Sequence, residues 1–363
     1  MAARNRLIRY EPDYTTAPGE VLEAYLNERG MTKADLAARC GRPTKTISEI
    51  IHGKAAITPE TALQLERVLG RPAALWQNLE ASYRLHLAEK GERGELAGHA
   101  EWAKGFPLKT MIERGYIESP KDDSDLVKRF LRFFGVGTVA GWNASFGEIQ
   151  VAYRRSPAFA AAPESVTAWI RMGEIEADKI ACAPFDKVRF KGALSEVRAL
   201  TSRSFPDIHG NVVELCAKAG VTVVLLPPLP KIHLSGLARW VSKEKALIQL
   251  SLRHKTNDHL WFSFFHEAGH VLLHGKKTIF IDDGGNDISE VEHEANRFAA
   301  DQLIPPAAFT AFRRSDDFST AAIKRFASKQ GVAPGIVVGR LQHEKAIPYS
   351  HHNDLKERLD WSE

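Results

Sequence analysis

One five-residue pattern, His266-Glu267-Ala268-Gly269-His270, constrains the fold of this chain more than any other feature. Two histidines four residues apart project from the same face of a helix. Their imidazoles can therefore reach one zinc ion at about 2.0–2.1 Å. Glu267 stands beside the first histidine, where it can take a proton from an attacking water. The pattern predicts a helix with His266 and His270 as metal ligands and Glu267 as catalytic base.

The flanking residues favour a helix over a chance match of five letters. Asn257 or Asp258 can cap its start, and Gly275 can end it. Apolar residues of the same stretch can bury the helix: Leu260, Phe264 and Phe265.

A zinc site of this kind needs a third protein ligand. His274 shares the face, but it starts roughly 12 Å along the axis from His266, since a helix rises about 1.5 Å per residue. The better source is the next predicted helix, residues 290–301. Its candidates on one face are Glu290, Glu294 and Asp301. Spacing alone does not choose among them, and a solvated acidic face is the simpler interpretation.

Four segments together resemble the ImmA/IrrE family of metallopeptidases. They are His266 to His270, Leu272-Leu273-His274, Glu294-Ala-Asn-Arg-Phe-Ala-Ala and Leu303-Ile-Pro-Pro. The resemblance implies a zinc-dependent endopeptidase (Zn²⁺) with a gluzincin-like His-His-Glu site, in which Glu294 is the third ligand. Because members of that family cleave repressor proteins, it also implies a protein substrate of that kind.

Short strand patterns precede the histidine helix. A helix over Asn211 to Ala219 and a strand over Val221 to Leu226 come first. Leu237 to Val241 and Ala246 to Leu250 then predict a hairpin. An edge strand beside a zinc helix can hold an extended peptide by backbone pairing.

Two further helices are expected after the histidine site, over Thr320 to Lys329 and Pro334 to Glu344. A hydrolase of this kind needs a donor for the developing oxyanion. The candidates in this region are His343, Arg340 and Tyr349, whose simpler interpretation is a surface helix and tail.

The other end of the chain predicts a helix-turn-helix. A helical run over Pro18 to Arg29 is followed by Thr32 and Asp35, which form a capping box for a second helix through Cys40. Gly41-Arg42-Pro43 predicts a tight turn between the second helix and a third helix, which ends at Gly53. Thr58 starts a fourth. The expected core residues are Leu36, Cys40, Ile47, Ile50 and Ile51.

This segment, roughly residues 15 to 85, resembles the HigA-type antidote regulators, a branch of the Xre/Cro-like repressors. The matching residues include Gly30-Met-Thr-Lys-Ala-Asp-Leu-Ala, Ile47-Ser-Glu-Ile-Ile and Ile57-Thr-Pro-Glu-Thr-Ala-Leu. Lys33 and Pro43 depart from the Gln and Ser that such repressors often carry. Those departures bear on base contacts and not on the fold.

The resemblance implies a double-stranded DNA operator, bound by a homodimer across two half-sites. Side chains at the start of the third helix lie where a recognition helix contacts base edges in the major groove. Basic side chains on either side of that helix are suited to contact the phosphates of the DNA backbone. The predicted DNA-binding residues are Arg42, Thr44, Lys45, Thr46, Ser48 and Lys54. A helical bundle without a DNA role is the alternative.

Composition agrees with an ordinary globular protein: 44% of the residues are hydrophobic, 26% are charged, and the formal net charge is +4. Three widely spaced cysteines, Cys40, Cys182 and Cys216, predict neither a disulfide framework nor a thiolate zinc site. With no signal peptide and no apolar membrane span, we expect a cytoplasmic protein that does not contact a membrane.

The expected fold is mainly α with a small β-sheet in the C-terminal part. We expect an N-terminal arm (1–17), a helix-turn-helix domain (18–94), a helical connecting region (95–200), an α+β zincin-like domain (201–348) and a tail (349–363).

The expected function is a DNA-binding regulator that carries a zinc endopeptidase. The alternative is an antitoxin-like regulator, with or without a toxin partner, whose peptidase-like domain is a non-catalytic sensor or a partner-binding module. A digestive protease fits poorly with a fused helix-turn-helix.

Overall fold

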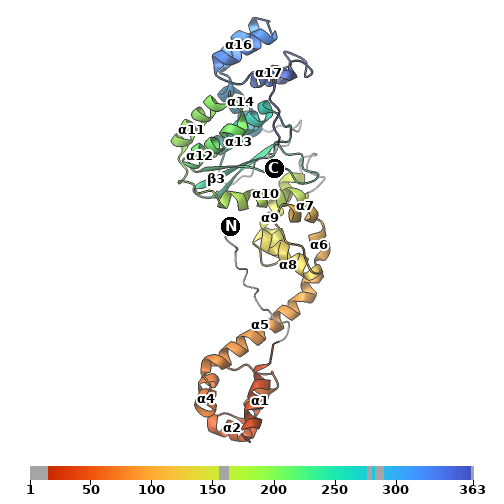
Figure 1. Ribbon diagram of the computed structural model, residues 1–363, viewed down its shortest axis with the longest axis vertical. Helices are drawn as coiled ribbons and strands as arrows, with labels where there is room; N and C mark the ends of the chain where they lie inside the picture. Colours follow the sequence, from red (N-terminus) through yellow and green to blue (C-terminus); the bar gives the residue numbers. More distant parts are fainter. Residues whose placement is uncertain (1–14, 155–162, 276–279, 283–289, 361–363) are drawn as a thin grey trace, which may run out of the picture. The chain divides into compact units, whose positions relative to one another are not determined.

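The computed structural model describes residues 15–154, 163–275, 280–282 and 290–360. The chain forms two compact units. The first comprises the residues up to Ala100 together with Asp122–Asp125, and the second comprises Glu101–Lys121 and Leu126–Glu363. The expectation of a mainly helical chain with a small C-terminal sheet is confirmed (Figure 1).

The first unit is a helical bundle. Its helices are α1 (Pro18–Glu28), α2 (Lys33–Cys40), α3 (Thr44–Ile51), α4 (Pro59–Leu69) and α5 (Ala73–Ala97). The predicted capping box is present at α2, because the Asp35 amide donates to Thr32 Oγ1 at 3.1 Å and the Thr32 amide donates to Asp35 Oδ2 at 3.0 Å. Gly41, in the left-handed region with φ 63°, ends that helix and turns the chain toward α3.

The bundle closes around one apolar core. All five residues expected in the core are buried, and Leu22, Leu65 and Trp76 join them with no exposed surface. Burial of this apolar area fixes which face of α3 points inward, and it leaves the other face of that helix available to a partner.

The second unit is built on a mixed sheet in the order β1-β3-β2-β4. Its strands are β1 (Val221–Leu225), β2 (Gly236–Ser242), β3 (Lys245–Leu250) and β4 (Phe280–Asp282). β1 runs parallel to β3, and the predicted β2–β3 hairpin is confirmed as an antiparallel pair.

β2 is paired on both sides over its first three residues, so this part of the predicted hairpin is not an edge at which an extended peptide could pair. Gly236–Ala238 pairs with Phe280–Asp282, so β4 lies outside β2. The sequence pattern did not indicate β4, which is only three residues long.

Helices cover both faces of the sheet. The helices that follow the first bundle are α6 (Ala100–Lys104), α7 (Leu108–Glu113), α8 (Asp123–Phe134), α9 (Val139–Arg154), α10 (Pro163–Asp178), α11 (Lys187–Leu200), α12 (Phe205–Ala217), α13 (Asn257–Leu273), α14 (Glu290–Leu303), α15 (Pro306–Arg314), α16 (Thr320–Gln330) and α17 (Pro334–His343). A short 3₁₀ turn follows at Asn353–Leu355.

Successive side chains of β3 point to opposite faces of the sheet and so pack against different helices. Ile248 and Leu250 share a core with α11, α12 and α13, whereas Gln249 points to the other face, where its Nε2 donates to the Trp169 carbonyl of α10 at 2.8 Å. Figure 1 shows α10 on one side of the sheet and α11–α13 on the other. α10, placed by the sequence in a connecting region, thus packs directly on the sheet.

The start of α13 differs in detail from the expectation. Thr256 occupies the N-cap position, so neither Asn257 nor Asp258 caps the helix. Instead, the Asn257 side chain accepts from the Glu357 amide at 3.2 Å, and Asp258 forms an ion pair with Lys356 at 2.7 Å. The C-terminal tail is therefore held against the start of α13 at Lys356 and Glu357.

We expect Lys356→Ala to lower the free energy of unfolding of the second unit by about 3 kcal/mol, since it strands the buried Asp258 carboxylate without its cation. The side chains of Lys356 and Asp258 are 10% and 5% exposed. Urea denaturation followed by tryptophan fluorescence measures the change. Lys324→Ala, at an exposed position of α16, is the matched control. Equal stability of the two variants would refute a stabilising role for the pair.

No helix in the described part of the chain is both long enough and apolar enough to cross a membrane.

Candidate metal centre and nucleic-acid interface

The histidine pattern lies on α13, a helix that is buried on almost every side. The sheet, α14 and α17 all pack against it. His266 and His270 are each 1% exposed, and Glu267 is fully buried. The predicted helix over the pattern is confirmed, although it ends at Leu273, two residues before Gly275.

Three side chains converge on one point beside α13. His266 Nε2 and His270 Nε2 lie 3.0 Å apart, and a carboxylate of Glu292 lies 3.1 Å from the first and 3.4 Å from the second. A tetrahedral ion with bonds of about 2.05 Å would separate its ligand atoms by about 3.3 Å. The donor set and its spacing therefore fit a single zinc ion.

The carboxylate in this group is not the one expected. Glu294, the third ligand implied by the resemblance, lies with His274, whose Nε2 is 3.2 Å from Glu294 Oε2, and its side chain is 55% exposed. Among the described residues, only Glu292 completes a cluster with the two histidines. Glu290 and Asp301, the other candidates, are outside that cluster.

The rotation of α14 explains the difference. Its buried stripe, Ala295, Ala299 and Leu303, packs toward α13. Glu292 lies three residues before Ala295 and so continues that stripe, whereas Glu294 is about 200° further around the helix. The spacing of small residues in the sequence is the signal that would have found Glu292.

The outward nitrogens of both histidines are also held. His266 Nδ1 lies 3.0 Å from Asn296 Oδ1, and His270 Nδ1 lies 2.9 Å from His274 Nδ1. His274 is therefore behind His270 and not in the cluster, as the rise of the helix predicted. Such contacts fix ring orientation and leave each Nε2 facing the cluster.

Electrostatics favour the protonation states that metal ligands need. Burial is the largest influence on His270 and lowers its pKa, outweighing the opposite effect of Glu292. Burial alone would raise the pKa of Glu292, but its hydrogen bonds and charge interactions with His266 and His270 outweigh burial and lower that pKa to about 2. At neutral pH these shifts favour a neutral imidazole at His270 and an ionised carboxylate at Glu292.

Glu267 occupies the space between α13 and the sheet. A Cβ built on Gly236 of β2 would lie 2.9 Å from Glu267 Oε1. The absence of a side chain at Gly236 is therefore what admits the carboxylate at this point of the strand.

The oxyanion candidates are placed differently from one another. Arg340 already interacts with residues outside the metal centre, because its Nε donates to Glu344 Oε1 at 2.6 Å and its guanidinium lies over the Phe309 ring. Tyr349 is 68% exposed. His343 is also exposed, and its ring is 6.3 Å from that of Phe262, which is 6.3 Å from the His266 ring. Of the three candidates, His343 is the one that these ring contacts link to His266.

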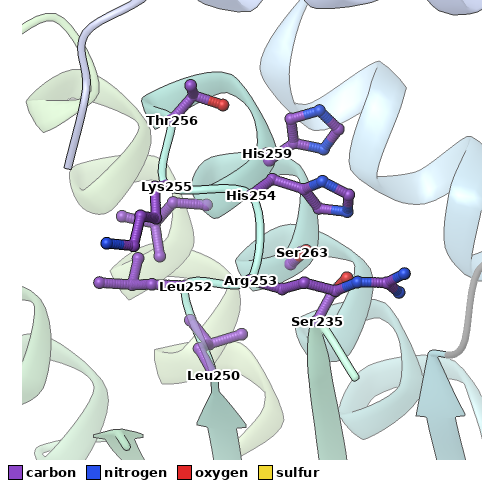
Figure 2. A pocket seen from close by; sticks show the side chains of 10 residues that line it. Ser235, Leu250, Leu252, Arg253, His254, Lys255, Thr256, His259 and Ser263 are labelled. Carbon is purple, nitrogen blue, oxygen red and sulfur yellow. The ribbon is translucent and has the colours of Figure 1, made fainter. Parts of the chain in front are cut away.

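A small cavity lies at the start of α13 (Figure 2). It encloses about 10 Å³, which is room for roughly one water molecule. The His254 and His259 rings, which are among its lining residues, are stacked with centroids 4.1 Å apart. His259 precedes His266 by two helical turns, but the cavity is too small to receive a peptide side chain.

In the first unit, four of the predicted DNA-binding residues lie on α3, whereas Arg42 precedes the helix and Lys54 follows it. Thr44, Lys45 and Lys54 are exposed, while Arg42, Thr46 and Ser48 are half-buried. The Lys45 side chain is 84% exposed and lies 3.9 Å from Glu49. Part of the Arg42 guanidinium is used in a contact within the bundle, since its Nε donates to Gln64 Oε1 of α4 at 2.8 Å.

Family models match both units. Residues 22–76 match the helix-turn-helix family, and residues 216–342 match the IrrE N-terminal-like domain. The uncharacterized HTH-type transcriptional regulator YddM of Escherichia coli (strain K12) is 34% identical over 73 residues, covering 20% of this chain and 78% of the relative. Virulence-associated protein I of Dichelobacter nodosus is 36% identical over 77 residues, covering 21% and 71%.

Two solved structures that resemble this chain each cover less than a quarter of it. An addiction module antidote protein of a HigA family from Coxiella burnetii is 30% identical with a TM-score of 0.21, covering 22% of this chain and 89% of that one. The Pseudomonas aeruginosa antitoxin HigA with the higBA promoter is 26% identical with a TM-score of 0.22, covering 23% and 90%.

Proposed function

Because the chain belongs to the helix-turn-helix family through residues 22–76 and carries an IrrE N-terminal-like domain at 216–342, we propose that it is a DNA-binding regulator whose second unit is a zinc-dependent endopeptidase. The observation that carries the proposal is the convergence of His266, His270 and Glu292 beside a buried Glu267. This arrangement combines a three-ligand metal site with a base that is not a ligand.

Each residue has a separate role in the proposed hydrolysis. His266, His270 and Glu292 would hold Zn²⁺, which when bound supplies a Lewis acid that acidifies water and polarises a carbonyl. Glu267 takes the proton of the attacking water and passes it to the leaving amine. Because Glu267 is fully buried, its interaction with the developing charge is stronger than it would be in bulk water. His343 is the remaining candidate for an oxyanion donor.

The proposed substrate is a protein that acts with this regulator. A repressor encoded beside it, or the N-terminal half of this chain, is the class that a fused helix-turn-helix favours. The supporting feature is that one chain matches the helix-turn-helix family at residues 22–76 and the IrrE N-terminal-like domain at residues 216–342.

Zinc removal tests the peptidase proposal. We expect the purified protein to contain about one zinc per chain and to cleave the candidate repressor. A chelator should abolish cleavage, and stoichiometric Zn²⁺ should restore it, because chelation leaves the ligand side chains chemically unchanged. Mass spectrometry of the products locates the bond. Zinc binding without cleavage of any candidate would instead favour a sensor or a partner-binding module.

For the first unit, we propose that a homodimer binds a palindromic operator through α3. Lys45→Ala and Thr46→Ala should each weaken operator binding by about 1–3 kcal/mol relative to random DNA. Arg42→Ala should weaken binding to both DNAs and reduce the salt slope by about one unit. Titrations at several salt concentrations measure both effects.

Lys329→Ala, on an exposed position of α16, changes the same charge and is the control for these titrations. If the α3 variants discriminate between operator and random DNA as well as this control does, α3 is not the recognition helix.

A further inference from the structure

We propose that Glu294 and His274 form a hydrogen-bonded relay that orients His270 and strengthens its bond to the metal. The inference rests on the proposed zinc centre and assigns Glu294 a positioning role in place of ligation. Glu294 therefore acts through another residue and does not touch the ion.

The relay is a continuous chain of contacts that runs between two helices. His270 Nδ1 lies 2.9 Å from His274 Nδ1, and His274 Nε2 lies 3.2 Å from Glu294 Oε2. The side chain of His274 is only 8% exposed, so it is enclosed between its two partners. Figure 1 shows α13, which carries both histidines, beside α14, which carries Glu294.

The positions of the protons along the relay follow from metal binding by His270. His270 can offer its Nε2 lone pair to a metal only when its ring proton is on Nδ1. That Nδ1–H then donates to Nδ1 of His274, which must accept, so the proton of His274 is on Nε2. His274 Nε2–H in turn donates to Glu294 Oε2. Every hydrogen-bond donor of the relay thus meets an acceptor, and the last acceptor is the Glu294 carboxylate.

The Nδ1 atoms of His266 and His270 thus have different hydrogen-bond partners. His266 Nδ1 faces a neutral amide oxygen, that of Asn296, at 3.0 Å. His270 is supported by a second imidazole and, beyond it, by a charged acceptor, which makes the stronger hydrogen bond. Partners of this kind fix the tautomer of a ligating histidine and raise its basicity. Because Glu294 is half exposed, water screens its charge and the effect is modest.

Zinc affinity, measured by competition with a chromophoric chelator on the full-length protein, tests the relay. Glu294→Ala should weaken zinc binding by about 10-fold, the lower end of the effect of outer contacts. His274→Ala should weaken it further, because His270 loses its acceptor. Glu290→Ala removes an exposed carboxylate from the same helix and should change nothing.

A double-mutant cycle separates a relay from simple structural support. His274→Asn places an amide oxygen near the position of the lost Nδ1, so it keeps an acceptor for His270 but cuts the link to Glu294. In that background, Glu294→Ala should have no further effect on zinc affinity, whereas independent contributions would add. Thermal unfolding of the metal-free variants checks that the fold is retained.

Each outcome of these measurements is decisive. Unchanged affinity in Glu294→Ala, or additive effects in the cycle, overturns the relay and leaves the proposed peptidase intact. Loss of zinc as complete in Glu294→Ala as in Glu292→Ala would make Glu294 a ligand and also overturn it. If the wild-type protein binds no zinc, the proposed metal centre fails, and the relay fails with it.

Discussion

Glu267→Gln should reduce cleavage of the protein substrate by about 10²–10⁴-fold while zinc content and operator affinity stay at the wild-type level. The substitution preserves the size of the side chain and removes the basic oxygen. Since Glu267 is fully buried beside Gly236, the amide fits the same space. Single-turnover cleavage, metal analysis and operator titration on one protein sample measure the three properties.

A second variant tests whether the two functions are separable. Lys45→Ala combined with Thr46→Ala should leave cleavage of an isolated repressor unchanged, because α3 belongs to the other compact unit. The proposal of a catalytic role fails if wild type and Glu267→Gln cleave at the same rate. If the two proteins also regulate a reporter identically under every inducing condition, the non-catalytic sensor becomes the better interpretation.

Glu292→Ala should remove zinc almost completely, an effect well beyond the about 10–100-fold change in affinity expected for an outer contact. His266→Ala should do the same. Each substitution deletes one corner of a triangle whose ligand atoms are 3.0–3.4 Å apart. Metal analysis after dialysis against buffered Zn²⁺ measures occupancy. Glu290→Ala is the matched control, because it removes an exposed carboxylate from the same turn of α14.

Retention of zinc by Glu292→Ala, together with its loss in Glu294→Ala, would restore the ligand set implied by the family resemblance. That result would require α14 to turn by nearly half a revolution, which would expose Ala295 and Ala299. The apolar area buried by these residues opposes such a rotation.

Local patterns in the sequence were sufficient for the helix-turn-helix and for the histidine pair. A capping box at Thr32 and Asp35, a glycine that ends α2, and apolar residues at helical spacing all specify structure over a few residues. The spacing of His266 and His270 likewise places both rings on one face before any tertiary contact forms.

Other features depend on residues that are far apart in the chain. β4 is three residues long and exists as a strand only because Gly236–Ala238 accepts it as a partner. The position of α10 against the sheet rests on the contact between Gln249 and Trp169, 80 residues apart. No local periodicity predicts either pairing.

The histidine face of α13 and the inner face of the DNA-binding bundle were determined by the sequence alone, because helical periodicity and capping are local. Which carboxylate meets those histidines was decided only by tertiary structure. Several acidic residues of α14 are chemically suitable, and packing of Ala295, Ala299 and Leu303 against the neighbouring helix sets its rotation. That rotation brings Glu292 to His266 and His270, and it leaves Glu294 beside His274.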